Sequence, residues 1–255
     1  MSLFAGAAEH YPVGRRPYPA EFATALRDEL GLDGTGRLLD VGCGPGSLTT
    51  LLAPLFAAAV GVDADPDMIA VAARRAPHID WHVLRGEDLP AGLGTFRVVT
   101  FAQSFHWMDQ PLVAARVRAM LDPHGAWVHV GGQTHRGVDG PEELPLPRPP
   151  WDAVDALVRS YAGPRRPTRS GEEDVMRAAG YRGPVRLAPW PGEVVERSAD
   201  ELVSAVFSLS SSAPPLFGDR LGAFEADLRR LLAETSPQGR FAERMGPPDL
   251  IVWRP

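Results

Sequence analysis

Short apolar runs alternate with amphipathic segments through the first half of this chain. The runs at 37–41 and 58–63 have the length of buried strands, whereas 19–30 carries Phe22, Leu26 and Leu30 at helical spacing. Strands that alternate with helices predict a parallel sheet covered by helices on both faces. Right-handed crossovers then place the carboxyl ends of the strands at one edge, where open α/β sheets bind ligands.

The same pattern can be followed to the end of the chain. Strands are predicted at 37–41, 58–63, 81–84, 97–102, 126–130, 185–188 and 250–253, and helices at 19–30, 48–57, 68–75, 111–121, 151–161, 171–179, 199–209 and 221–232. Pro54 is expected to end or kink its helix early, and Asp65-Pro66-Asp67 to begin the next one. The acidic segment 172–174 is expected to be the solvated first turn of a helix.

Composition excludes several classes of protein. The 255 residues are 44% hydrophobic, with a net charge of −6, which favours an ordinary globular protein over one that binds nucleic acid. No apolar run approaches the length of a membrane span, and the first residues lack the pattern of a signal peptide. Cys43 is the only cysteine, which indicates a reducing compartment, so we expect a cytoplasmic protein. The histidines and Cys43 show no metal-ligand spacing, so no metal is expected.

The segment LLDVGCGPGSLT carries the strongest functional signal. Gly42, Gly44 and Gly46 follow a predicted strand and begin a helix, so the backbone can turn tightly beside a ligand. A dinucleotide fingerprint needs a third glycine where Ser47 stands. Asp40, just before the turn, would oppose a pyrophosphate but suits a cationic ligand. With Asp63 positioned to bind a ribose diol, the loop predicts S-adenosylmethionine as the ligand.

Three motifs in order extend this prediction. LLDVGCGPG, VGVDADPDMI and GEDLP resemble the successive motifs of class I S-adenosylmethionine-dependent methyltransferases, over roughly residues 11–131. The chain looks most similar to the small-molecule, trans-aconitate methyltransferase-like branch. Members of that branch often carry R-P-x-Y-P near the N-terminus, and Arg16-Pro17-Tyr18-Pro19 is one residue short of it.

The resemblance implies a fold and a division of the chain. The fold is α/β: a doubly wound, Rossmann-like sheet of about seven strands, mostly parallel with the last strand antiparallel, plus a helical cap. A single domain would span 1–255, with a cofactor-covering segment at 1–30, a cofactor-binding core at 31–131 and substrate cap elements at 132–180 and 191–220. The proline-rich stretch that follows Val130, and the segment near 199–217, would form this cap.

The resemblance also implies roles for individual residues. The backbone of Gly42–Gly46 would lie along the methionine part of the cofactor, with Asp40 orienting its amino group. Asp63 would bind the ribose hydroxyls, Met68 would line the adenosine, and Ala64 and Leu89 would lie on the two sides of the adenine. Glu87 or Asp88, with Asp88 slightly preferred, would bind the adenine amino group. The remaining predicted cofactor-binding residues are Tyr11, Arg16, Cys43 and Gln103. S-adenosylhomocysteine would be the product.

The acceptor side is predicted from FAQSFHWMDQ, which follows the fourth strand. His106 is the one group there that titrates near neutral pH, so it is the candidate general base; the alternative is a pocket wall. The predicted substrate-contacting residues are Tyr18, Ser104, Phe105, His106 and Trp107. Arginines at 165, 166 and 169 could meet an acidic substrate, although a solvated loop is the simpler interpretation.

The leading hypothesis is in-line methyl transfer to a hydroxyl or carboxylate of a small molecule. N- or C-methylation and a non-catalytic S-adenosylmethionine-binding protein are the alternatives. A nucleic-acid methyltransferase is disfavoured, because the aromatic motif that such enzymes carry after strand four is absent, and a nicotinamide dehydrogenase is disfavoured by Ser47. The sequence identifies neither the acceptor nor the oligomeric state.

Overall fold

The computed structural model describes residues 6–132, 134–141, 143–163 and 171–255. The chain divides into two compact units. Unit 1 comprises Met1–Pro17, Gln133–Pro167 and Pro191–Gly246, and unit 2 comprises Tyr18–Gly132, Thr168–Trp190 and Pro247–Pro255. This division does not test the predicted single domain with cap elements, which stays a prediction. The arginines at 165, 166 and 169 lie outside the described residues.

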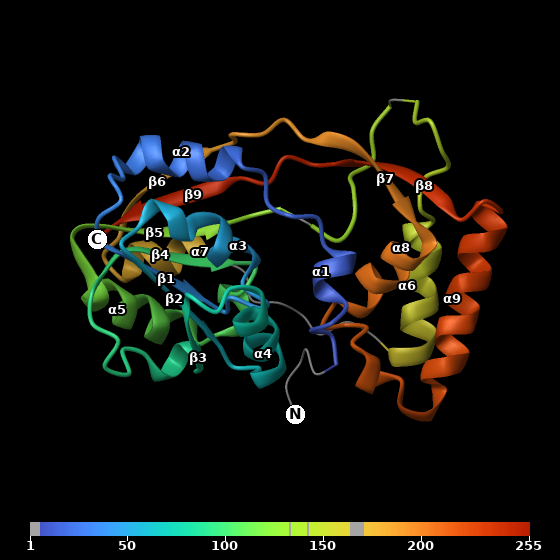
Figure 1. Ribbon diagram of the computed structural model, residues 1–255, viewed down its shortest axis with the longest axis horizontal. Coiled ribbons are helices and arrows are strands. Elements are labelled where there is room, and N and C mark those ends of the chain that lie inside the picture. The colour runs from blue at the N-terminus through green and yellow to red at the C-terminus, as the bar shows by residue number, and fades with distance from the viewer. Residues whose placement is uncertain (1–5, 133, 142, 164–170) are drawn as a thin grey trace. The chain divides into compact units, whose positions relative to one another are not determined.

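Unit 2 is built on a seven-stranded sheet in the order β3-β2-β1-β4-β5-β9-β6 (Figure 1). Its elements are α2 (Glu21–Leu30), β1 (Arg37–Val41), α3 (Ser47–Leu52), β2 (Ala58–Asp63), α4 (Pro66–Arg75), β3 (Asp80–Val83), β4 (Phe96–Ala102), α5 (Gln110–Met120), β5 (Leu121–Val130), α7 (Glu172–Ala178), β6 (Arg182–Leu187) and β9 (Leu250–Arg254). Neighbours among β1 to β5 pair in parallel, whereas β9 runs antiparallel to both β5 and β6. The predicted fold class is therefore confirmed, including the reversed last strand.

Two apolar cores cover the two faces of this sheet. The neighbours Leu38 and Leu39 on β1 are both fully buried, but they belong to different core clusters because successive strand side chains point to opposite faces. Phe22 of α2 packs in the first cluster, and Val113 of α5 and Met176 of α7 pack in the second. This double burial explains why the strands read as continuous apolar runs.

Local sequence fixes where several elements begin and end. Helix α4 begins after Asp65, whose carboxylate accepts a hydrogen bond of 2.9 Å from the Asp67 amide, and Pro66 occupies its first turn. Pro54 ends α3 early, as expected, because the chain continues as a short 3-10 turn at Ala53–Leu55. Further 3-10 turns lie at Gly86–Asp88, Phe105–Trp107, Pro214–Leu216 and Gly218–Arg220.

The start of β5 was wrongly predicted. The strand begins at Leu121, directly after α5, instead of at residue 126. Its register with β4 shifts between the pairs Phe96–Leu121 and Val98–Ala126. An irregular stretch of this kind holds extra residues in a ladder, so the polar segment 122–125 enters the strand without an alternating pattern.

Unit 1 has its own core and its own small sheet. Its elements are α1 (Tyr11–Gly14), α6 (Trp151–Ala162), β7 (Glu193–Ser198), α8 (Ala199–Phe207), α9 (Leu221–Thr235) and β8 (Arg240–Met245). Buried side chains of α6, α8 and α9 form one cluster, in which the Phe217 and Phe224 rings stack at 4.0 Å. The antiparallel pair β7–β8 was not predicted, because charged residues interrupt both strands. No helix among the described residues is long and apolar enough to cross a membrane.

Candidate functional site

The glycine loop joins the carboxyl end of β1 to α3. The amides of Gly42 and Cys43 both donate to the Val62 carbonyl, at 2.8 and 3.0 Å, so the loop folds back over β2. Gly42 has a φ of +68°, and a Cβ there would lie 2.4 Å from Cβ of Ser104. At Gly46, with φ +78°, a Cβ would lie 2.4 Å from the Trp81 ring. Both positions therefore require glycine.

Gly44 differs from its two neighbours in the loop. It also has a positive φ, of +54°, but a Cβ there would meet no atom within 4 Å. Packing against the protein therefore explains Gly42 and Gly46, whereas Gly44 borders open space. An open backbone position in a tight loop is what close approach of a ligand requires.

Asp63, the last residue of β2, ties the loop to the next strand. Its Oδ2 accepts a hydrogen bond of 2.8 Å from the Gly44 amide, and its Oδ1 accepts one of 2.9 Å from the Asp65 amide. Burial raises the pKa of this carboxyl. Because each carboxylate oxygen has two acceptor positions, both can still bind a hydroxyl of a ligand. Asp63 thus holds the loop in shape beside its predicted role at a ribose.

Asp40 lies beneath the loop and is fully buried. The hydroxyls of Thr49 and Thr100 donate to its two oxygens, at 2.6 and 2.8 Å. Burial, opposed by these hydrogen bonds, raises the pKa of Asp40 to about 6. Cys43 is also buried, and burial raises the pKa of its thiol, which disfavours the reactive thiolate form. The predicted cofactor contacts of both residues stay predictions.

The raised pKa of Asp40 predicts a pH-dependent stability. Between about pH 4 and 6 the unfolded carboxyl loses its proton while the folded one keeps it, so the free energy of unfolding falls as the pH rises. The full cost at pH 7 is about 3 kcal/mol. The variant Asp40→Asn should lack this decline and be about 1–3 kcal/mol more stable at pH 7 than the wild type. Urea unfolding of both proteins from pH 4 to 7 measures the difference, and a wild-type stability that rises relative to Asp40→Asn over this range would contradict it.

The 3-10 turn Gly86–Asp88 distinguishes the two acidic residues predicted near the adenine. Oε1 of Glu87 accepts a hydrogen bond of 3.0 Å from the Asp109 amide, so this carboxylate holds the next loop. Asp88 is exposed, which leaves it as the candidate for the adenine amino group. Ala64 is exposed as well, whereas Met68 and Leu89 are 2% and 0% exposed. The adenosine contacts of these residues stay predictions.

The turn after β4 is held in place by two buried residues, Ser104 and Phe105. Phe105 is 1% exposed and packs edge-on against Phe101 and Trp127, so the structure places it in the core instead of on a pocket surface. Ser104 is also buried, and its hydroxyl donates to the Val41 carbonyl at 2.6 Å, which fixes this stretch against β1. The two predicted substrate contacts are thus engaged in holding the turn.

His106 and Trp107 are partly exposed and belong to the 3-10 turn Phe105–Trp107. Their ring centroids lie 4.8 Å apart. Burial lowers the pKa of His106, and no described residue makes a hydrogen bond or ion pair with its ring. Gln103 precedes them with a φ of +54°, and its side-chain amide donates to the Val130 carbonyl at 3.4 Å. His106 is therefore neutral and free to accept a proton at neutral pH.

The predicted residues of the N-terminal segment belong to different units. Tyr18 lies in unit 2, where its ring packs 5.9 Å from Phe22 beside the core. Tyr11 and Arg16 lie in unit 1: Arg15 stacks over the Tyr11 ring at 4.7 Å, and Arg16 lies 3.9 Å from Glu193. The roles predicted for Tyr11, Arg16 and Tyr18 stay predictions.

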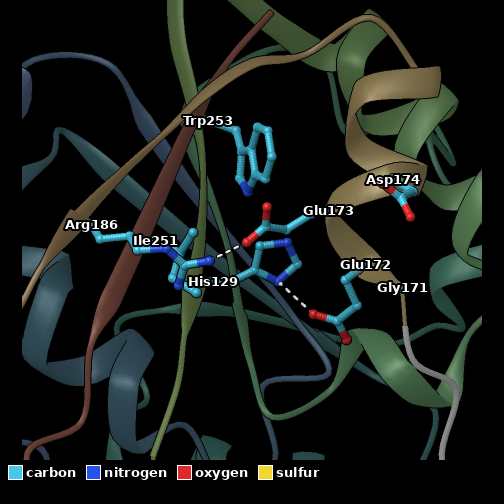
Figure 2. A pocket seen from close by; sticks show the side chains of 8 residues that line it. All are labelled: His129, Gly171, Glu172, Glu173, Asp174, Arg186, Ile251 and Trp253. Atoms are coloured by element: carbon cyan, nitrogen blue, oxygen red, sulfur yellow. Dashed lines mark hydrogen bonds and ion pairs between the residues drawn. The ribbon is translucent and has the colours of Figure 1, made fainter.

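Sequence reasoning missed His129 in unit 2 and its contact with Glu172. His129, near the carboxyl end of β5, is 8% exposed, and its Nδ1 lies 3.7 Å from Oε2 of Glu172 on α7 (Figure 2). The acidic segment 172–174 is the first turn of α7, as predicted; within it Asp174 is exposed, whereas Glu173 pairs with Arg186 of β6. Both glutamates face the sheet because α7 packs on it. A lone histidine within the apolar run 126–130 was the available signal.

Comparison with known proteins agrees with this geometry. Residues 38–125 match the model of a methyltransferase domain family. An uncharacterized methyltransferase of Mycobacterium tuberculosis is 33% identical over 126 residues, which are 49% of this chain and 50% of that protein. A ubiquinone biosynthesis O-methyltransferase of Cereibacter sphaeroides is 38% identical over 114 residues, or 43% of this chain and 46% of that one. The matches thus span about half the length of these curated relatives.

A solved structure extends the similarity beyond the matched half. A protein of Anaeromyxobacter dehalogenans described as a type II methyltransferase covers 94% of this chain, and 94% of its own length is matched. Its sequence identity is 24% and its TM-score 0.55. At this identity the likeness establishes the fold alone.

Proposed function

We propose that this chain is an enzyme that transfers a methyl group from S-adenosylmethionine to a small molecule, since its residues 38–125 match a methyltransferase domain family. The observation that carries the proposal is the loop at the carboxyl ends of β1 and β2. It combines an open glycine, Gly44, with the carboxylates Asp40 and Asp63, and no basic side chain belongs to Gly42–Gly46. S-adenosylhomocysteine is the second product.

The residues of this edge fit such a cofactor. Two acidic groups near the loop suit a ligand with a sulfonium and an ammonium, and would repel the pyrophosphate of a dinucleotide. In the proposal the Gly42–Gly46 backbone and Asp40 hold the methionine part, Asp63 binds the ribose hydroxyls, and Asp88 with Ala64 binds the adenine. Exposure of Asp88 and Ala64 supports the last assignment.

S-adenosylmethionine supplies a methyl group that is already bonded to a good leaving group. The protein therefore needs to position the acceptor atom behind that methyl group and keep water away, and positioning alone can contribute as much as about 7–11 kcal/mol. His106, neutral and without a hydrogen-bond partner among the described residues, would take the proton of a hydroxyl acceptor. Trp107 would form part of the acceptor wall.

We favour oxygen as the accepting atom, in a hydroxyl or a carboxylate. A neutral histidine is useful for a hydroxyl, and the relative from Cereibacter sphaeroides is an O-methyltransferase by name. N- or C-methylation and cofactor binding without turnover are the alternatives, and the trans-aconitate methyltransferase-like branch and a cytoplasmic location remain predictions. An acceptor screen with labelled S-adenosylmethionine distinguishes these reactions, and binding without turnover across the screen would favour the non-catalytic protein.

The cofactor assignment has a direct test. Isothermal titration of the full chain with S-adenosylmethionine should show saturable binding, and Asp63→Ala should bind about 10- to 100-fold more weakly, because a charge-assisted bond to the ribose and the Gly44 anchor are lost together. Asp67→Ala is the matched control, since it removes an exposed carboxylate from the first turn of α4. An unchanged dissociation constant in Asp63→Ala would contradict the ribose role, and no binding to the wild type would reject the proposed function.

A further inference from the structure

A row of three side chains crosses the half of the sheet that lies away from the glycine loop. His129 of β5 pairs with Ile251 of β9, which in turn pairs with Arg186 of β6. Directly paired residues of neighbouring strands point to the same face of a sheet. With α7 and Trp253, these residues line a pocket of about 390 Å³, and the close view shows the Glu172 and Glu173 carboxylates of α7 directed toward the row (Figure 2). In the order of the strands, β4 separates this pocket from β1 and its loop.

One carboxylate of the pocket, that of Glu172, is not paired with a cation among the described residues. Arg186 pairs with Glu173 and lies 3.7 Å from Asp249, and Arg177 pairs with Glu173 at 2.8 Å. Both arginines therefore form ion pairs with carboxylates other than that of Glu172. Among the described residues, Glu172 has only two polar contacts, and both are long.

Within the part of the chain that the structure describes, these two contacts provide no cation for the charge of Glu172. They are 3.7 Å to Nδ1 of His129 and 3.5 Å from the Gln110 side-chain amide. Burial raises the pKa of Glu172, which is the direction expected for a carboxylate without a nearby cation. A partly buried carboxylate of this kind is stabilised by a positively charged hydrogen-bond donor.

His129 does not supply that positive charge. Its side chain is nine-tenths buried, and burial lowers its pKa to about 3, so it is neutral at ordinary pH. Its Nε2 has no hydrogen-bond partner among the described residues. The pocket therefore combines a neutral imidazole, a carboxylate that has no counter-ion among the described residues, and the apolar side chains Ile251 and Trp253.

We propose that this pocket binds a small organic cation, with a primary ammonium group bound by Glu172 and an apolar body against Ile251 and Trp253. Glu172 is the carboxylate that selects the ligand, because Glu173 of the same turn is already paired with Arg186. An anion is disfavoured, because it would have to displace Glu173 from Arg186 in the presence of Glu172 and Asp174. The site goes beyond the proposed methyl transfer and does not depend on it.

Benzylammonium, titrated into the full chain and followed by isothermal calorimetry and ligand-observed NMR, tests the site. We expect saturable binding, no binding of benzoate, and binding at least about tenfold weaker in Glu172→Gln, which keeps the size of the side chain and removes its charge. Asp174→Asn, on the same turn but exposed, is the matched control and should change the affinity less than about twofold. Nuclear Overhauser effects should connect the Ile251 methyl groups with the ring protons of the probe.

Any one of three other results would overturn the proposal. These results are no saturable binding to the wild type, equal affinity in wild type and Glu172→Gln with unchanged circular dichroism, and binding without contact to Ile251. Displacement of the probe by S-adenosylmethionine would place it at the cofactor loop and reject the separate site. Failure of S-adenosylmethionine to bind would instead reject only the proposed function.

Discussion

Turnover should fall by roughly 10²- to 10⁴-fold when His106 is replaced by alanine, while the dissociation constant of S-adenosylmethionine stays within a few-fold of its wild-type value. The reason is the position of His106, which follows β4 on the 3-10 turn Phe105–Trp107 and whose ring has no hydrogen-bond or ion-pair partner among the described residues. Single-turnover rates with labelled cofactor and a responding acceptor measure the effect.

The pH profile separates proton transfer from a role as a pocket wall. Because burial lowers the pKa of His106, the wild-type activity should fall only below the ordinary histidine value of about 6.5, as the imidazole becomes protonated. His106→Gln fills a similar volume but cannot act as a base near neutral pH. It should lose both the activity and this acid limb. A fully active His106→Ala, or a His106→Gln that keeps the wild-type rate and profile, would exclude general-base catalysis.

The largest loss of stability is expected from Arg197→Met in unit 1. Arg197 and Glu243 form an ion pair of 2.9 Å whose side chains are 1% and 3% exposed. The Glu243 carboxylate also accepts hydrogen bonds of 2.6 Å from the Gly137 amide and 2.9 Å from Nε1 of Trp151. Removing one partner of a buried pair leaves the other charge uncompensated, which costs about 3–5 kcal/mol.

Arg197 also holds backbone carbonyls from several parts of unit 1. Its guanidinium donates to the carbonyls of His135, Gly14 and Glu201, at 2.7, 2.8 and 3.0 Å. The variant should therefore release β7, α1 and the segment after residue 133 together. Hydrogen exchange followed by mass spectrometry should show faster exchange in peptides of unit 1, beside a lower midpoint of urea unfolding.

A surface ion pair in the same unit is the control for this prediction. Arg229 pairs with Asp200 at 2.6 Å, but these side chains are 46% and 79% exposed. Solvent screens such a pair, so Arg229→Met should cost less than about 1 kcal/mol. Equal losses of stability in the two variants would show that burial of the Arg197–Glu243 pair is not what stabilises unit 1.

The local pattern of residues predicted most of unit 2 because each of its elements has a local cause. Buried strands such as β1 and β2 appear as short apolar runs that end at glycine or aspartate, and α4 begins at the Asp65-Pro66 pair. The ribbon β7–β8 lacked such a signal, since a two-stranded sheet depends on cross-strand partners that lie far apart in the chain. The same reason explains the early start of β5, whose register is set by β4.

The sequence by itself determined the fold class and the glycine loop, because strand period, turn glycines and acidic strand ends are short-range properties of the chain. Tertiary structure decided which polar groups are exposed and which are engaged. In the folded chain Phe105 is buried in the core, and His129 lies opposite Glu172. The Glu87 carboxylate accepts a hydrogen bond from the Asp109 amide, whereas Asp88 is exposed. Burial and partner choice depend on elements that meet only after folding, and burial is what shifts the pKa values of Asp40 and His129.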